Sequence, residues 1–385
     1  MKVLRLETTG EHLIMNKTNI PIRILQISYD MSLGGAETLI MNLYRNLDRT
    51  KVQFDFLLHS NEKSTYEDEI TALGGKIYRI PRFLGYNKFS YDKVLRDFLL
   101  KHPEYKIIHD HLMDSATETF RVAKKLGRRT IAHSHIAQYG FSINELIRSY
   151  FRKDICKFSD YRFACSEDAG NWLYKGKGSF FVLRNGIETS KFCFSQEKRN
   201  ELRKALGIKE NEFAVIHIGR FVEQKNHKRI ISIFKEITDL KENSKLFLVG
   251  EGPLKAEIEK QVAEFKLTDK VIFLGTRKDV NELLSAFDVF LFPSLFEGLG
   301  IVLIEAQASG LPCVFSDVIP TEVALIPSIL KPISLEDTNR AWAEATITSR
   351  PLEHREDGYS LVKEAGYDIR DIAKELENFY LQLGH

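Results

Sequence analysis

The feature that most limits the fold of this chain is an alternation of short apolar runs with segments of helical period, and the alternation occurs in two blocks. Near-continuous apolar runs separated by amphipathic helices are typical of parallel sheets that are covered on both faces. We therefore expect an α/β fold with two doubly wound, Rossmann-like domains. The strands expected in the first block are Ile22–Ser28, Val52–Leu58, Lys76–Ile80, Lys106–Asp110, Arg129–His133, Tyr161–Cys165 and Phe180–Leu183, and those in the second are Phe213–Ile218, Lys245–Gly250, Lys270–Leu274, Asp288–Pro293 and Pro312–Phe315.

The domain boundaries follow from where the periodic segments stop. A length of 385 residues fits two domains of ordinary size. The polar stretch from Glu188 to Asn200 lacks a strong period, so we expect a linker at residues 191–200 between domains at 1–190 and 201–365. The last segment, 366–385, contains an amphipathic helix from Ile369 to Leu383. Residues 1–14 have no clean periodicity and are expected to be a disordered leader, with Met15 as the more natural start.

The composition excludes several classes of protein. Hydrophobic residues make up 43% and charged residues 28% of the chain, which is typical of globular domains and excludes a disordered, collagenous or disulfide-rich protein. The four cysteines form no C-x-x-C, which indicates a reduced compartment without a zinc ribbon. No uncharged stretch is long and apolar enough to span a bilayer. We therefore expect a cytoplasmic protein.

The charge is divided unevenly along the chain. Residues 1–200 carry 32 Lys and Arg against 23 Asp and Glu, a net charge of +9, whereas the remaining residues carry 23 against 30, a net charge of −7. The basic half either meets an anionic partner or differs only by drift of its solvated surface. The segment from Phe141 to Lys157 interleaves aromatic and aliphatic residues with cations, as an interfacial helix would. The same segment must also pack on its own sheet, so both interpretations stay open.

Three loops that follow expected strands carry residues suited to phosphate. Gly34 and Gly35 open a helix after the first strand, where either a phosphate or an ordinary tight turn would favour glycine. The dinucleotide pattern G-x-G-x-x-G is absent. Arg220 and Lys225 lie five residues apart after the first strand of the second block, where they either converge on one anion or belong to a solvated loop.

The third loop also carries two carboxylates. Glu297 ends the loop after the strand Asp288–Pro293, and the amides of the following residues begin a helix that could bind phosphate: Gly298, Leu299, Gly300 and Ile301. Glu305 lies in the otherwise apolar helix Ile301–Ala308. A buried carboxylate needs a partner. That partner is either a pair of ribose hydroxyls or a neighbouring cation in a structural ion pair.

Two H-x-H pairs, His109 with His111 and His133 with His135, follow strands of the basic domain. Residues i and i+2 on a strand point the same way, so each pair could bind a metal, but few carboxylates lie near them. The alternatives are a single histidine acting as a base or hydrogen-bond donor, and histidines that only cap strand ends. We predict no metal site.

These motifs, in their order and spacing, resemble retaining glycosyltransferases of the GT-B class, the group called family 4. The resemblance is carried by Gly219-Arg220 with Lys225, by Glu297 and Glu305 with seven residues between them, and by Gly34–Glu37, Asn185–Ile187, Val249–Pro253 and Phe287–Phe290, and it covers the chain from about Ile22. The stretches Thr130–His135 and Gly300–Gln307 are similar to bacterial transferases of capsular and exopolysaccharide biosynthesis.

The resemblance implies a role for each matching residue. Arg220 and Lys225 would hold the diphosphate of a nucleotide sugar, expected to be UDP-linked, and Glu305 its ribose. Glu297 would contact the donor sugar, and His133 would contact donor sugar and acceptor. The glycines Gly34, Gly35 and Gly250, the helix start Gly298–Ile301, and Thr276 beside the base would complete the donor site, with the two domains facing a central crevice. The helix at 366–385 would cross back to the first domain.

The resemblance also implies the reaction: transfer of a hexosyl group with retention, without a metal, to a hydroxyl of a saccharide acceptor that is expected to be linked to polyprenyl diphosphate. The sequence contains no D-x-D, which disfavours the metal-dependent class of transferase. We expect no bound cofactor, no nucleic-acid partner, and a peripheral contact with the anionic inner face of the membrane. A sugar-nucleotide 2-epimerase of the same fold, a non-catalytic scaffold of a polysaccharide assembly complex and, least favoured, a metal hydrolase are the alternatives.

Overall fold

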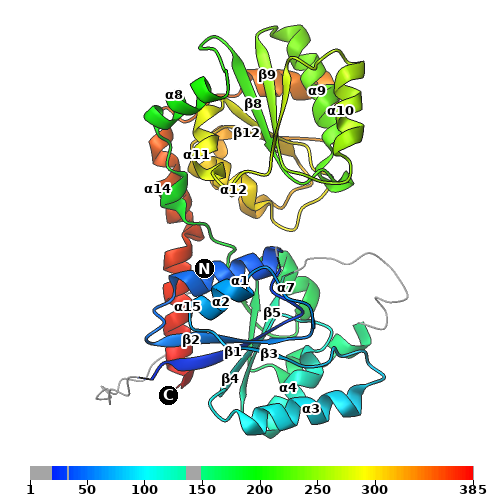
Figure 1. The fold of residues 1–385 in the computed structure, drawn as a ribbon, viewed down its shortest axis with the longest axis vertical. Helices are drawn as coiled ribbons and strands as arrows, with labels where there is room; N and C mark the ends of the chain where they lie inside the picture. Colours follow the sequence, from blue (N-terminus) through cyan, green and yellow to red (C-terminus); the bar gives the residue numbers. More distant parts are fainter. Residues whose placement is uncertain (1–19, 33, 136–148, 385) are drawn as a thin grey trace. The chain divides into compact units, whose positions relative to one another are not determined.

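The computed structural model describes residues 20–32, 34–135 and 149–384, and its chain divides into two compact units (Figure 1). Unit 1 comprises Met1–Gly186 together with Ile369–His385, and unit 2 comprises Ile187–Asp368. The leader expected at residues 1–14 lies outside the described residues, as do the first eight residues of the cationic segment that begins at Phe141. Unit 2 is therefore a continuous stretch of chain that is inserted into unit 1.

Unit 1 is built on a seven-stranded sheet whose strands all run parallel, in the order β3-β2-β1-β4-β5-β6-β7. The apolar runs form these strands because both faces of the sheet are buried. The strands are β1 (Ile22–Ser28), β2 (Val52–Leu58), β3 (Ile77–Arg79), β4 (Ile107–Asp110), β5 (Arg129–Ser134), β6 (Tyr161–Ala164) and β7 (Phe181–Val182).

The helices of unit 1 cover the two faces of that sheet. One core lies beneath α1 and α15 and contains Tyr44, Phe54 and Phe379, and the other contains Tyr91, Leu95 and Leu99. The helices described are α1 (Gly35–Asn46), α2 (Glu67–Ala72), α3 (Lys88–Lys101), α4 (Ala116–Lys125), α6 (Ile155–Phe158), α7 (Glu167–Tyr174) and α15 (Ile369–Gly384). The last of these, drawn in red in Figure 1, packs beside α1, which is why the chain's end belongs to unit 1.

Unit 2 repeats the design with a six-stranded parallel sheet in the order β10-β9-β8-β11-β12-β13. Its strands are β8 (Phe213–Ile218), β9 (Ser244–Val249), β10 (Val271–Gly275), β11 (Val289–Phe292), β12 (Cys313–Ser316) and β13 (Leu330–Ile333). Its α-helices are α8 (Gln196–Ala205), α9 (His227–Leu240), α10 (Lys255–Glu264), α11 (Val280–Leu283), α12 (Ile301–Ala308), α13 (Asn339–Thr348) and α14 (Gly358–Val362). Both orders are doubly wound, as the sequence predicted.

The strand order determines where each unit can bind a ligand. In unit 1 the order reverses between β1 and β4, and in unit 2 between β8 and β11. Ligands of open α/β sheets bind beyond the carboxyl ends of the strands at such a switch point, because the loops there diverge to opposite faces. The residues after β1, β4, β8 and β11 therefore lie where each unit would bind a ligand.

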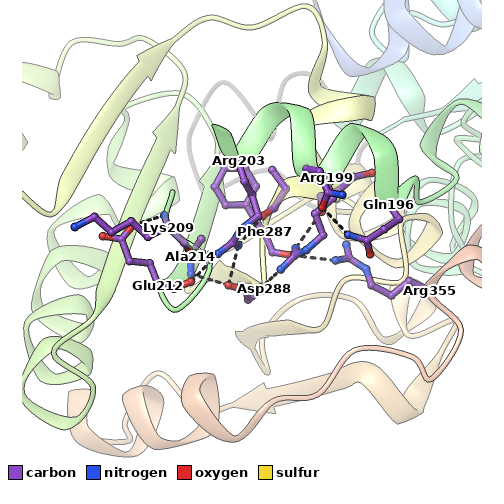
Figure 2. Close-up of polar contacts among 12 residues, drawn as sticks. Gln196, Arg199, Arg203, Lys209, Glu212, Ala214, Phe287, Asp288 and Arg355 are labelled. Carbon is purple, nitrogen blue, oxygen red and sulfur yellow. Dashed lines mark hydrogen bonds and ion pairs between the residues drawn. The ribbon is translucent and has the colours of Figure 1, made fainter. Parts of the chain in front are cut away.

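Three arginines hold α8 and the C-terminal part of unit 2 against the amino end of its sheet (Figure 2). Arg199 and Arg203 both pair with Asp288, at 2.5 and 3.3 Å, and Asp288 also accepts from the amide of Ala214 at 2.8 Å. Arg355 instead donates to backbone carbonyls, among them that of Phe287 at 3.1 Å. Its burial and the nearby charge of Arg199 lower the pKa of Arg355 to about 9. This cluster is structural, since its donors are used by carbonyls and one carboxylate.

Two expectations about the C-terminal block differ from the structure. The linker expected at 191–200 lies within unit 2, where Ser195 caps α8 by accepting from the amide of Lys198 at 3.2 Å, so its polar residues form the exposed face of a helix. The unit boundaries fall instead at Gly186 and Asp368, beside the bridge between Ile187 and Asp368. The strand β13 was not expected, because it contains Pro332, and proline is tolerated only at an edge such as this one.

Candidate active site

The loop after β8 lies against the loop after β9 through two glycines. Gly250 has φ +138°, and a Cβ placed on it would lie 2.1 Å from the carbonyl oxygen of Gly219. A side chain at Gly250 would therefore displace the backbone that leads directly into Arg220. The glycine that the sequence assigned to the donor site thus positions the cationic loop.

Lys225 and Glu297, which the sequence assigned to one site, do meet. The Lys225 ammonium donates to Glu297 Oε1 at 2.6 Å and lies 5.0 Å from the ring centre of Phe292. Both side chains are largely buried, with 17% and 8% exposed. Lys225 ends the 3₁₀ turn η2 (Glu223–Lys225), and Glu297 follows β11, so the pair joins the loops of the two switch-point strands.

Two amide side chains fasten these loops together. Gln224 donates to the carbonyl of Phe296 at 2.9 Å and to Glu297 Oε2 at 3.3 Å. Asn226, in the left-handed region with φ +56°, donates to the carbonyl of Pro293 at 3.0 Å. Neither residue was singled out from the sequence, where they only separate the charged residues of the motif. They hold Lys225 and Glu297 in register.

Arg220 is different, because its side chain is exposed and makes no hydrogen bond or ion pair with any residue that the structure describes. An unpaired guanidinium beside a buried ion pair leaves a net positive charge at the carboxyl end of β8. Thr276, expected near the base, is exposed after β10, and no described contact joins it to the other site residues.

The helix α12 begins next to this charge. Gly300 forms its N-cap in the left-handed region with φ +83°, and no side chain caps the amides of the first turn, which begins at Ile301. Gly298 is exposed and Leu299 is buried. Uncapped amides and the helix dipole together favour an anion at this end.

Glu305 lies on the same helix, one turn beyond its start. Its side chain is partly buried, and burial raises the pKa of Glu305 to about 7. No cation or hydrogen-bond donor contacts its carboxylate among the residues the structure describes, which removes the structural ion pair as an explanation. A desolvated carboxylate without a protein partner is suited to accept hydrogen bonds from a ligand.

The expected residues of unit 1 lie after β1 and within β5. Gly34 is the N-cap of α1, and Gly35, its first residue, is exposed, with open space where a Cβ would point. His133 is the second-last residue of β5 and is only 2% exposed. Its side chain stands among three other histidine rings rather than alone.

The four histidines of the H-x-H pairs form one stacked cluster. The ring centres of His109 and His111 lie 4.5 Å apart, and those of His133 and His135 lie 4.1 Å apart, so the residues of each pair share a face as the spacing predicted. His109 Nε2 lies 3.2 Å from His133 Nδ1, and His111 Nδ1 lies 2.7 Å from His135 Nε2. Burial lowers the pKa of His109 to about 3 and that of His135 to about 4, and it holds the pKa values of His111 and His133 well below their usual range. All four rings are therefore neutral at pH 7.

Two further residues complete the cluster. His109 Nδ1 lies 2.6 Å from the hydroxyl of Tyr380 on α15, and His111 Nε2 lies 2.8 Å from Oε1 of Gln26 on β1. Gln26 is recognisable in the sequence only as a polar residue inside an apolar strand, and Tyr380 only as part of the apolar face of its helix. One ring nitrogen from each of His109, His111 and His133 lies within 4.8 Å of the other two, close enough for the three to bind one metal ion. Hydrogen bonds already use both nitrogens of His109 and of His111.

Comparison with known proteins places this geometry in a family. The family model described as "Glycosyl transferases group 1" matches residues 198–327, and that described as "Glycosyltransferase Family 4" matches residues 33–191. EpsF of Bacillus subtilis (strain 168), which its name describes as a glycosyltransferase, is 34% identical over 372 residues, covering 93% of this chain and 96% of that protein. The chain belongs to glycosyltransferase family 4. It is thus a glycosyltransferase by family.

Other proteins are similar to this family 4 glycosyltransferase in sequence or in fold. The UDP-Gal:alpha-D-GlcNAc-diphosphoundecaprenol alpha-1,3-galactosyltransferase of Escherichia coli is 25% identical over 327 residues, covering 79% of this chain and 81% of the relative. The crystal structure of Anabaena Alr3699/HepE in complex with UDP superposes with a TM-score of 0.77 at 17% identity, over 92% of this chain and 98% of that one. The sucrose-phosphate synthase of Thermosynechococcus elongatus gives a TM-score of 0.71 at 21% identity, over 94% and 99%. The fold is GT-B.

Among the described residues, no helix is both long and apolar enough to cross a bilayer.

Proposed function

We propose that this glycosyltransferase moves a hexosyl group from a UDP-sugar to a hydroxyl of a lipid-linked saccharide, with retention, in the synthesis of a surface polysaccharide. The observation that carries the proposal is the switch point of unit 2, where the exposed Arg220, the Lys225–Glu297 pair and the uncapped start of α12 gather at the ends of β8 and β11. Positive charge and free amides at this position suit the diphosphate of a nucleotide sugar.

In this proposal the cations stabilise the leaving group. Breaking the bond from the anomeric carbon to the diphosphate leaves negative charge on the phosphate oxygens, and Arg220 and Lys225 offset that charge as a metal does in other transferases. The absence of D-x-D from the sequence is consistent with a metal-independent reaction. The acceptor hydroxyl would attack from the face that the leaving group vacates, and a phosphate oxygen would take its proton.

The remaining site residues would bind the donor. Glu305, desolvated and without a described protein partner, is placed to accept hydrogen bonds from the ribose hydroxyls. Glu297 would exchange part of its contact with Lys225 for hydroxyls of the sugar. Gly34 and Gly35 would offer the amides at the start of α1 to the diphosphate, and His133 would contact sugar hydroxyls.

The acceptor part of the proposal rests on the relatives. The Escherichia coli relative is named for an acceptor linked to diphosphoundecaprenol, and a 26% identical relative from Streptococcus pneumoniae is named alpha-monoglucosyldiacylglycerol synthase. Acceptors with lipid anchors are reached most readily by an enzyme that touches the membrane.

A surface suited to such contact lies beside α3 in unit 1. Tyr86 and Phe89 are each 85% exposed, and Leu84 next to them is 49% exposed. The backbone of this loop passes close to the Phe151 ring, since a Cβ on Gly85 would lie 2.7 Å from it. Tyr150 precedes Phe151, and the ammonium of Lys153 lies 3.9 Å from the centre of the Tyr150 ring. We propose that this aromatic patch, Leu84, Tyr86 and Phe89, docks on an anionic bilayer. Exposed aromatic rings flanked by cations favour the interface.

One cation of the segment from Phe141 to Lys157, which the sequence suggested as an interfacial helix, does not serve this role. Arg152 is only 7% exposed, and its guanidinium lies 4.7 Å from the ring centre of Trp172. The alternation of charges along the sequence could not distinguish a cation packed inward from one that faces solvent.

The deciding experiment supplies a panel of UDP-sugars with a polyprenyl-diphosphate-linked saccharide and follows both product and released UDP. A lipid-linked product in which the new bond keeps the donor's anomeric configuration, formed in the presence of EDTA, supports the proposal. Inversion at the anomeric carbon, or conversion of the UDP-sugar without any acceptor, as an epimerase would give, contradicts it.

A further inference from the structure

The histidine cluster of unit 1 contains two hydrogen-bonded branches that start from one amide group. Gln26 contributes Nε2 to one branch, at 3.4 Å from the hydroxyl of Tyr380, and Oε1 to the other, at 2.8 Å from His111 Nε2. Gln26 and His109 are paired neighbours across β1 and β4, so the sheet itself fixes where the amide lies. We propose that Gln26 is a positioning residue that determines which ring nitrogen of His133 and of His135 carries a proton.

The first branch leads to His133. An amide nitrogen only donates, so Gln26 Nε2 donates to the Tyr380 oxygen, and the Tyr380 hydroxyl then gives its own proton to His109 Nδ1, 2.6 Å away. A neutral imidazole that accepts at one nitrogen carries its proton on the other, so His109 donates from Nε2 to His133 Nδ1 at 3.2 Å. His133 therefore carries its proton on Nε2.

The second branch leads to His135 by the same logic. An amide oxygen only accepts, so His111 donates from Nε2 to Gln26 Oε1. His111 Nδ1 is then an acceptor, and His135 donates to it from Nε2 at 2.7 Å. His135 is left with an unprotonated Nδ1.

The two branches end on complementary groups. His133 Nε2 is a donor and His135 Nδ1 is an acceptor, both are buried, and neither has a hydrogen-bond partner in the structure as described. The rings that carry them lie 4.1 Å apart. A hydroxyl group both accepts and donates, so adjacent sugar hydroxyls match this pair, whereas a phosphate oxygen would meet the lone pair of His135 unfavourably.

A consequence for the reaction follows, and it rests on the proposed function. His133 with a proton on Nε2 cannot take another proton there while it stays neutral, so it orients a sugar hydroxyl and does not deprotonate the acceptor. The proton distribution itself does not depend on any activity. Turning the Gln26 amide by half a turn would reverse every donor and acceptor in both branches, which makes the inference testable.

The test is the ¹⁵N spectrum of the full-length protein labelled at histidine, because protonated and unprotonated ring nitrogens have different shifts. Assignment uses single histidine substitutions. We expect a proton on Nε2 of all four rings in the native protein. A proton on Nδ1 of His133 overturns the proposal, whether or not the protein transfers sugar.

Two variants separate positioning from packing. Tyr380→Phe removes the hydroxyl that donates to His109 and so interrupts only the first branch. His109 and His133 should then populate both tautomers, while His111 and His135 keep theirs. Gln26→Leu, which replaces the amide with an apolar group of similar size, should interrupt both branches, so that all four histidines populate both tautomers. If Gln26→Leu fails to fold, Tyr380→Phe decides alone. Unchanged tautomers in a folded Tyr380→Phe protein contradict the proposal.

The kinetic effect distinguishes the inference from the proposed function. Tyr380→Phe should lower kcat about threefold to tenfold, the range expected when one neutral hydrogen bond is misdirected, and leave UDP affinity unchanged. Correct tautomers in a protein without transferase activity would overturn the proposed function alone. Altered tautomers with full kcat would overturn the role of His133 as an orienting donor.

Discussion

The ammonium of Lys225 lies 2.6 Å from Glu297 although the two residues are 72 positions apart in the chain. The carboxylate of Glu297 therefore neutralises one of the two cations that the proposed diphosphate would use. A phosphate group that binds here must compete with Glu297 for Lys225, because both seek the same donor.

The competition predicts opposite effects of two substitutions. Glu297→Gln should tighten UDP binding about threefold to tenfold by releasing Lys225, even though turnover falls, whereas Lys225→Met should weaken UDP binding by a similar factor. Isothermal titration calorimetry with UDP measures both. Weaker binding in both variants would show that Glu297 supports the site and does not compete for Lys225.

Arg220 offers a cleaner test of leaving-group stabilisation, because its side chain has no described partner whose loss would destabilise the fold. Arg220→Ala should reduce kcat about a hundredfold, or about 3 kcal/mol of transition-state stabilisation, with no change in melting temperature. Arg340→Ala, which removes an exposed arginine of α13, is the matched control and should keep full activity. A similar loss in both variants would indicate a general effect of surface charge.

The raised pKa of Glu305, about 7, gives the site a pH dependence. Ribose hydroxyls donate to an ionised carboxylate better than to a neutral one, so the contribution of Glu305 to nucleotide affinity should increase as the pH rises through 7. Glu305→Gln should weaken binding at pH 8 about tenfold and remove this part of the dependence.

The measurement is the difference in UDP affinity between native protein and Glu305→Gln from pH 6 to pH 8, since ionisation of the phosphate affects both proteins alike. A constant difference over this range would mean that Glu305 is already ionised in the free protein. Equal affinities at every pH would make Glu305 structural.

The buried histidines predict a further dependence on pH. An imidazole titrates near pH 6.5 in an unfolded chain, whereas burial lowers the pKa of His109 to about 3 and that of His135 to about 4. Because the folded pKa is the lower one, each ring contributes stability that is present above pH 6.5 and is lost as the pH falls toward the folded value, by up to about 1.4 kcal/mol per pH unit.

Ring resonances of these histidines should therefore stay at neutral-imidazole positions from pH 8 to pH 5, while the same protein in denaturant titrates near pH 6.5. Titration of the cluster near pH 6.5 in the native protein would show that the rings are hydrated. It would also remove the basis for fixed tautomers.

The aromatic patch predicts binding to vesicles that contain anionic lipid. Tyr86→Ser with Phe89→Ser should reduce co-sedimentation at least tenfold, because each exposed ring contributes apolar area to the interface. Leu100→Ser is the control, since Leu100 is 55% exposed near the other end of the same helix. Equal binding by the double variant and the native protein would exclude the patch, and binding that persists at high salt would exclude the electrostatic part.

The sequence predicted most of the scaffold because buried parallel strands are locally apolar. The bounds expected for β1, β2 and β8 agree with the structure to the residue. The strand β13 was not predicted because it contains Pro332. A strand tolerates proline only at the edge of a sheet, and β13 lies at such an edge. Edge position is a tertiary property that one segment does not reveal.

The sequence predicted the site residues that belong to short contiguous motifs. It did not predict contacts between residues that are far apart in the chain. The sequence placed Lys225 and Glu297 in one site but could not show that they contact each other. Gln26 and Tyr380 meet across 354 positions, and each has an ordinary role in its own segment. Only the fold brings a strand of the N-terminal region and the last helix to the same histidines.

The insertion of unit 2 into unit 1 has a consequence for the order of events during synthesis. Residues 187–368 are continuous and leave the ribosome as a complete folding unit, whereas the core of unit 1 lacks Ile369, Leu376 and Phe379 until the whole of unit 2 has been synthesised. A nascent chain thus holds a finished second unit beside an open first one. Since Tyr380 belongs to the same helix, the histidine cluster receives its proton donor only after unit 2 has been synthesised, and a chain cut short before Tyr380 would leave the tautomers of its histidines undetermined.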